Sequence, residues 1–241
     1  MSPQVKSKER VAEHGEVFTA EREVKAMCDL VSQECDRIDS RFLEPACGNG
    51  NFLAEVLSRK LATVKKLYKS NHYDYERYSV LAVSSIYGVE LLQDNAEECR
   101  ERLYELWNKE YTAVCKKDCN EETREAVRYI INCNILCGNA LTLMQVDGNQ
   151  QDTDKPIIFP EWSMLMGTKL KRRDFRLDVL LKANEKPAKK SKQTSLFSDE
   201  DDITKYLTTN PSTGEYMPLP ICEYPPVHYK RVKEIGAENN G

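Results

Sequence analysis

Residues 42–53 read FLEPACGNGNFL, and this stretch decides the fold. Its opening apolar pair predicts a short buried strand that ends at Glu44. Gly48 and Gly50 allow the chain to turn sharply with positive φ and to approach a ligand closely. An amphipathic helix is predicted from about Phe52 to Tyr68, and its first amides are free hydrogen-bond donors at the turn. The stretch therefore predicts a strand, a ligand-binding turn and a helix in immediate succession.

The same alternation of strands and helices continues on both sides of this unit. Helical spacing of apolar residues predicts helices at Glu21–Cys35, Tyr78–Ser85, Asp94–Trp107 and Glu121–Ile131. Short apolar runs predict strands at Ile86–Glu90, Ile135–Cys137 and Pro156–Phe159. This alternation predicts an α/β fold with a mostly parallel sheet, helices on both faces, and ligands at the carboxyl ends of the strands.

The pattern changes near residue 183. Residues 1–182 are expected to form one α/β domain with an N-terminal helix. Lys, Ser, Asp and Glu dominate residues 183–210, and residues 211–227 hold five prolines. Residues 183–241 are therefore predicted to be a flexible charged linker followed by an extended Pro-rich C-terminal tail.

The composition excludes several classes of protein. Of 241 residues, 40% are hydrophobic and 31% are charged, which is typical of a globular protein with a packed core. No apolar run approaches the ~20 residues of a membrane span, and the polar N-terminus predicts a cytoplasmic protein. Nine scattered cysteines fit reduced, buried thiols. Two Cys-x₃-Cys pairs, at 115/119 and 133/137, have zinc-like spacing, but Cys137 falls on a predicted buried strand and no metal site is predicted.

Residues 42–53 resemble motif I of the S-adenosylmethionine-dependent DNA amino-methyltransferases. The resemblance is strongest to the modification subunits of restriction–modification systems, which read D/E-P-A-C-G-S/N-G-x-F-L. Three further segments occur in the family's order. GEVFTA at 15–20 resembles the G-x-x-F/Y-T-P segment, with Ala20 in place of the usual proline; GVE at 88–90 resembles motif II, and CGNAL at 137–141 resembles motif III. The resemblance implies a Rossmann-like class I methyltransferase fold for residues 1–182, with S-adenosylmethionine as its cofactor.

The resemblance also implies a role for each matching residue. Glu44 would accept from the cofactor's amino group, Glu90 from both ribose hydroxyls, and Asn139 would address the adenine amino group. Each also has an ordinary structural alternative: a helix cap for Glu44, a strand-end acid for Glu90, and a turn residue for Asn139. The full set of implied cofactor-binding residues is Phe18, Thr19, Glu44, Pro45, Ala46, Gly48, Gly50, Asn51, Glu90, Leu91, Asn139, Ala140 and Leu141.

A nicotinamide dinucleotide is the competing cofactor for a glycine-rich turn. Such a site requires a third small residue after the two glycines and an acidic residue about 20 positions further on. Here Asn51 and Phe52 follow Gly50, so the third small residue is missing. The next acidic residue at a strand end is Glu90, 40 positions after Gly50. Both differences favour S-adenosylmethionine.

The sequence departs from the family at the catalytic motif. Members carry D/N-P-P-Y/F after the fourth strand, where two acceptors hold the adenine amino group and an aromatic ring stacks on the flipped base. The sequence contains no such motif. Glu161 and Trp162 are the catalytic candidates nearest the expected place, with a structural role in the sheet as the alternative.

Two functions are therefore predicted. The first is a site-specific adenine DNA methyltransferase with a divergent catalytic loop. The second is a catalytically incomplete, cofactor-binding subunit or degenerate homologue that works with a partner chain. Only 100 residues follow Leu141, and many of them are polar, which favours the second function.

Two segments suggest macromolecular partners besides a second restriction–modification subunit. The net charge of −4 argues against wholesale binding to nucleic acid, but Lys169–Lys192 holds ten basic and three acidic residues. This basic stretch is either a phosphate-contacting patch for DNA or a solvated linker. Gln193, Leu196 and Phe197 resemble a peptide by which bacterial proteins bind the replication sliding clamp; the alternative is an apolar pair that packs on the parent domain.

Overall fold

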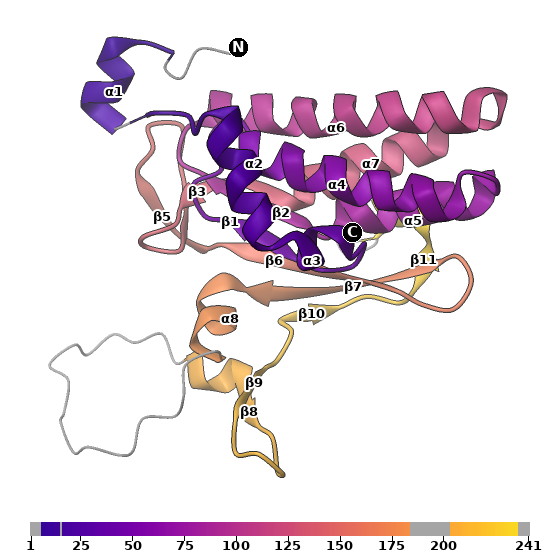
Figure 1. Ribbon diagram of the computed structural model, residues 1–241. Helices are drawn as coiled ribbons and strands as arrows, with labels where there is room; N and C mark the ends of the chain where they lie inside the picture. Colours follow the sequence, from indigo (N-terminus) through magenta and orange to yellow (C-terminus); the bar gives the residue numbers. More distant parts are fainter. Residues whose placement is uncertain (1–5, 15, 184–202, 236–241) are drawn as a thin grey trace, which may run out of the picture.

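Figure 1 shows the computed structural model, which describes residues 6–14, 16–183 and 203–235. Its largest sheet has five strands in the spatial order β1-β2-β3-β4-β5. The parallel strands are β1 (Phe42–Glu44), β2 (Ile86–Glu90) and β3 (Ile135–Asn139). The antiparallel strands that follow are β4 (Met144–Val146) and β5 (Asp152–Pro156). The protein is therefore a mixed α/β fold, and the predicted parallel arrangement is confirmed for the first three strands only.

A helix precedes each parallel strand, and helices also follow β1 and β2. Their bounds are α1 (Lys8–His14), α2 (Glu21–Leu30), α3 (Ser32–Asp36), α4 (Asn51–Tyr68), α5 (His72–Ser84), α6 (Gln93–Cys115), the short 3₁₀ helix η1 (Lys116–Asp118), α7 (Glu121–Asn134) and α8 (Leu177–Ala183). α4 and α6 pack against each other and against β2, while α5 and α7 pack against each other. No helix within the described ranges is both long and apolar enough to cross a membrane.

One face of the sheet is covered by α4 and α6. A side chain at Gly88 would meet Leu53 of α4, and Arg100 of α6 donates to the carbonyl oxygen of Ile135 at 2.9 Å. Lys60 of α4 is completely buried, and its ammonium donates to the carbonyl oxygens of residues 37, 38 and 40 at 2.6–3.2 Å. Burial lowers the pKa of Lys60 to about 8. These contacts fix the chain that leads into β1, so the glycine turn after β1 starts from a defined position.

The other face is covered, at two positions, by a β-hairpin. Its strands, β6 (Ile158–Met164) and β7 (Lys169–Arg176), are antiparallel. The Phe159 ring contacts the Tyr87 ring edge-on with centroids 5.4 Å apart, and Ile157 fills the space next to Gly138. A hairpin therefore lies where a second helical layer was expected. The strand predicted at 156–159 is also shifted, since Pro156 ends β5 and β6 continues to Met164.

The described part of the C-terminal segment corrects the expectation of a loose, extended tail. It contains η2 (Ile203–Tyr206), β8 (Leu207–Thr209), β9 (Tyr216–Pro218), β10 (Cys222–Glu223), β11 (Val227–His228) and η3 (Tyr229–Glu234). β10 and β11 both pair with β7, and the side chains of Tyr229 and Val232 are fully buried. The physical reason is that these apolar side chains, spaced as on one helix face, pack on α7. The domain boundary at residue 183 stays a prediction.

The predicted helices exist, but several differ from the expected bounds: the helix expected at 78–85 begins at His72, and the helix expected at 121–131 continues to Asn134. The stretch expected as one helix at 21–35 is divided at Val31, whose backbone leaves the helical region (φ −119°, ψ 31°). The helix expected to end near Trp107 continues to Cys115, because Tyr111, Val114 and Cys115 extend its buried face. The helices following β1 and preceding β3 begin within one residue of the predicted positions.

Candidate cofactor site

The site begins with the glycine turn, residues 45–50, which joins β1 to α4. Gly48 and Gly50 both have positive φ, at 52° and 84°. A Cβ added at Gly50 would lie 2.7 Å from the Cys99 sulfur, so this position has no room for a side chain. The amide of Cys47 donates to the carbonyl oxygen of Val89 at 3.0 Å and ties the turn to β2. The turn thus needs glycine both for its backbone angles and for its close contact with α6.

Glu90 lies at the end of β2 and is 8% exposed. Its carboxylate accepts from the amide of Gly48 at 2.8 Å and from the amide of Leu92 at 3.0 Å. The side chain predicted to bind ribose therefore also holds the glycine turn in place. Its Oε1 also accepts from the Asn95 side-chain amide at 3.5 Å, so Oε2 is the oxygen with a further lone pair for a ligand hydroxyl.

Glu44 lies at the end of β1, where it is paired with Gly88 of β2, two residues before Glu90. Burial raises the pKa of Glu44, and a hydrogen bond from the Ala46 amide opposes this effect. Among the described residues, no Lys, Arg or His forms an ion pair with it. A hydrogen bond with the Cys99 thiol, burial, and the charges of Glu90 and Glu44 raise the pKa of Cys47. Both carboxylates thus act on the same thiol, and the end of the sheet is acidic there.

Asn49, at the tip of the turn, was missed by the sequence analysis. It is 5% exposed, and its amide nitrogen donates to Glu98 at 3.1 Å. Its amide oxygen is buried and has no hydrogen-bond partner among the described residues. An unsatisfied buried acceptor costs about 1–3 kcal/mol unless a donor reaches it. The signal in the sequence was a polar residue between two glycines, where small residues would suffice for the turn.

The segment that resembles the family's N-terminal motif lies over the turn. Phe18 is buried, and its ring lies 3.2 Å from the place of a Cβ at Gly48. Asn51 connects this segment to α6, because its amide nitrogen donates to the Thr19 carbonyl oxygen at 3.1 Å and its oxygen accepts from Arg102. The structure thus brings Phe18, Thr19 and Asn51 together with the glycine turn.

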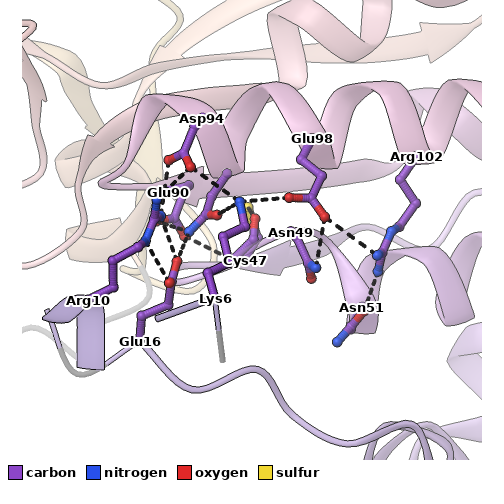
Figure 2. Close-up of polar contacts among 12 residues, drawn as sticks. Lys6, Arg10, Glu16, Cys47, Asn49, Asn51, Glu90, Asp94, Glu98 and Arg102 are labelled. Carbon is purple, nitrogen blue, oxygen red and sulfur yellow. Dashed lines mark hydrogen bonds and ion pairs between the residues drawn. The ribbon is translucent and has the colours of Figure 1, made fainter. Parts of the chain in front are cut away.

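Ion pairs hold the rest of this segment, which we call the N-terminal arm (residues 6–14 and 16–18), against α6, as Figure 2 shows. Arg10 pairs with Asp94 at 2.6 Å and with Glu16 at 2.7 Å, and Lys6 pairs with Glu98 at 2.7 Å. The hydrogen bond from Arg10 lowers the pKa of Asp94 to about 2. The arm therefore covers the site by charge as well as by the packing of Phe18.

The residues resembling motif III lie at the same end of the sheet, because Cys137 is paired with Glu90. The Asn139 side chain is engaged locally: its oxygen accepts from the Leu141 amide and its nitrogen donates to Asp152, both at 3.0 Å. Leu141 is 95% exposed. This geometry is that of a turn residue. Both ends of the Asn139 amide are therefore engaged within the protein, and its contact with a cofactor stays a prediction.

The two catalytic candidates lie side by side in β6, and their side chains point in opposite directions. Trp162 is in the core, 3% exposed, and its indole nitrogen donates to Asn134 at 2.8 Å. Glu161 is held between two guanidinium groups, those of Arg41 at 2.6 Å and Arg173. Trp162 therefore has the structural role that was its alternative, because the β-strand alternation turns its ring inward and Glu161 outward.

The described part of the basic stretch is largely neutralised by ion pairs. Lys171, Arg172, Arg173 and Arg176 pair with Glu223, Asp174, Glu161 and Asp178, respectively. Residues 184–192 of the stretch lie outside the described residues, as do Gln193, Leu196 and Phe197. Groups of three or more metal-binding side chains are absent from the part of the chain that the structure describes.

Comparison with known proteins adds no relative. No family model, curated protein or solved structure matches the chain. The chemistry of the site is therefore argued from its residues and their geometry.

Proposed function

We propose that this chain binds S-adenosylmethionine at the glycine turn and is an adenine-specific DNA methyltransferase of the restriction–modification type, with a Rossmann-like class I methyltransferase fold. The observation that carries the proposal is the convergence of Glu44 and Glu90 beside a turn of positive-φ glycines, at the ends of adjacent parallel strands. Ligands of α/β folds bind at this end of the sheet. A cationic nucleoside with a diol suits two carboxylates better than an anionic dinucleotide does.

The residues of the site fit this cofactor. Glu44 is a partly buried carboxylate without a cation, and a ligand ammonium or sulfonium would supply one. The Asn49 amide oxygen needs a donor, which a ligand amino group provides. Glu90 Oε2 can accept from a ribose hydroxyl while it keeps Gly48 in place. When bound, S-adenosylmethionine supplies a methyl group on a positively charged sulfur.

A second function, the catalytically incomplete subunit that needs a partner chain, is favoured by one observation. Methyl transfer to adenine requires an acceptor for the amino hydrogens and a ring that stacks on the base. Trp162 is packed in the core, and Glu161 is paired with Arg41 and Arg173. Under this proposal a partner chain provides the acceptor, and DNA binds across both chains.

Calorimetry with S-adenosylmethionine tests the shared part of both functions. The wild-type chain should bind, and Glu44→Gln should weaken binding about tenfold or more, because a hydrogen bond to a charged group is lost. Glu105→Gln is the matched control, since Glu105 is an exposed glutamate on α6. The proposal fails if the wild-type chain does not bind or if Glu44→Gln binds as tightly as wild type.

Turnover then separates the two functions. Transfer of a labelled methyl group to duplex DNA by the isolated chain supports the complete enzyme. Binding of the cofactor without transfer, with transfer restored by a second subunit, supports the incomplete one.

A further inference from the structure

An open groove lies between the β1 end of the sheet and the β6–β7 hairpin, and it reaches Tyr87 of β2. This β1 groove has a volume of about 620 Å³. Its walls come from β1, the β6–β7 hairpin, α8 and β9, and include Leu43, Phe159, Phe175, Leu181 and Met217. The groove is separate from the glycine turn, none of whose residues lines it.

The outer edge of β1, which borders the groove, carries backbone groups that pair with no other described strand. The Phe42 amide donates to the Ser85 carbonyl oxygen at 2.9 Å, toward β2. Because neighbouring residues of a strand direct their amides and carbonyls to opposite sides, those of Leu43 point away from β2, at the edge of the sheet that borders the groove. No strand within the described ranges pairs with β1 on this side. A free strand edge with apolar surroundings is a template for a further strand.

The rim of the β1 groove is apolar and exposed. Leu43, Leu181, Tyr216 and Met217 are between 38% and 45% exposed. They come from three different elements and lie around one groove. Clustered exposed apolar side chains of this kind mark binding surfaces more often than single ones do.

The groove also has a local excess of positive charge. Arg41 and Arg173 share a single carboxylate, that of Glu161, and all three residues line the groove. The side chain of Arg41 is 52% exposed and that of Arg173 is 37% exposed, so both remain accessible. An acidic side chain of a binding partner would complement the second guanidinium.

These observations identify the kind of partner. We propose that the β1 groove binds an extended strand of a separate polypeptide, which pairs with Leu43, places apolar side chains along the groove and places an acidic side chain at Arg41 and Arg173. The inference does not depend on cofactor binding.

Selection of peptides tests the proposal. Random decapeptides displayed on phage are selected on the full chain, and the enriched peptides are synthesised. We expect alternating apolar residues with one Asp or Glu. Leu43→Pro removes both the outward amide and the leucine side chain at an edge position that tolerates proline, and should weaken binding about tenfold or more. Leu30→Ala is the control, since Leu30 is 87% exposed and does not line the groove.

A second measurement keeps the test independent of whether Leu43→Pro folds. N-methylation of alternate amides in the peptide should abolish binding to the wild-type chain when those amides face β1, and have little effect at the other positions. No enrichment, or equal binding by Leu43→Pro and by both N-methylated forms, overturns the proposal. The proposal is also overturned if the selected peptides contain no acidic residue and bind the Arg173→Gln variant as tightly as the wild-type chain.

The β1 groove could instead be occupied by another segment of the same chain. If deletion of residues 184–202, which lie outside the described ranges, makes the Leu43 amide exchange faster in the full protein, the groove is filled internally and the proposal is wrong. Calorimetry with S-adenosylmethionine on the same preparations reports separately on the proposed function.

Discussion

Two glutamates at adjacent strand ends show how the surroundings give the same residue type different roles. Glu90 accepts from two backbone amides, so its charge is already stabilised by the protein. Glu44 has one such amide and is partly buried, and its pKa is raised as a result. Glu44 is therefore the carboxylate that a cationic ligand would stabilise more, and its substitution should affect the binding of such a ligand more strongly.

The affinity for S-adenosylmethionine should depend on pH through Glu44. The cationic ligand favours the ionised carboxylate, and burial raises the pKa of that group, so protonation begins at a higher pH than for an ordinary glutamate. Affinity should fall as the pH is lowered through this raised pKa. Calorimetry across the acidic range should show the fall in wild type and a flatter profile in Glu44→Gln. Parallel profiles would show that another group is responsible.

The residue types of the candidate site could be predicted, but their contacts only in part. The sequence placed Glu44, Glu90 and the glycines at strand ends, because acids and glycines directly follow apolar runs. It could not show that Glu90 bonds to the Gly48 amide, since that contact joins residues 42 positions apart. Asn139 was assigned to the cofactor, whereas in the structure Asp152 and the Leu141 amide take its hydrogen bonds.

At the scale of elements, local patterns predicted the β1–α4, β2–α6 and α7–β3 units because each buries one apolar face. Of the β6–β7 hairpin, β7 was read as part of a basic stretch, and β6 was predicted only in its first residues. The charges of β7 are balanced by Glu161, Asp174 and Glu223, which come from three strands, so only the folded arrangement reveals the pairing. Prolines similarly concealed β10 and β11, the two C-terminal strands that pair with β7.

The glycine turn is the element most sensitive to a small substitution. Gly50→Ala introduces a Cβ 2.7 Å from the Cys99 sulfur at a φ of 84°, and should lower the free energy of unfolding by about 1–3 kcal/mol. Gly148→Ala is the control, because a Cβ there meets nothing within 4 Å. Urea unfolding of both variants provides the measurement. Equal midpoints would mean that the turn adapts to a side chain, contrary to the argument above.

For the whole molecule, a buried network joins the C-terminal segment to the helices. Glu76 of α5 accepts from Tyr229 at 2.5 Å and from Tyr111, and pairs with Lys230 at 2.7 Å. Burial by itself would raise the pKa of Glu76, but the hydrogen bonds from Lys230, Tyr111 and Tyr229 lower it overall. This carboxylate therefore stabilises the fold above the ordinary glutamate pKa, and the contribution is lost as the pH falls through its lowered value.

Two lysines of η3 offer a matched comparison. Lys230→Met leaves the buried Glu76 without its cation and should cost about 3 kcal/mol at neutral pH. Lys233→Met breaks an ion pair with Glu125, in which both side chains are nearly half exposed, and should leave the unfolding midpoint almost unchanged. Thermal unfolding at neutral pH measures both. A similar loss in the two variants would assign the effect to η3 as a helix rather than to Glu76.

Under the proposed function, the N-terminal arm would give cofactor binding a particular time course. Phe18 lies over Gly48, and the pairs of Lys6 and Arg10 with α6 hold its segment there, so we expect the arm to open before a ligand reaches the turn. The observed association rate should therefore level off at high ligand concentration, at the rate at which the arm opens. Added salt screens those surface pairs and should speed this limiting step, although it weakens the attraction between a cation and an acidic site. Stopped-flow fluorescence at several salt concentrations would separate the two opposing effects.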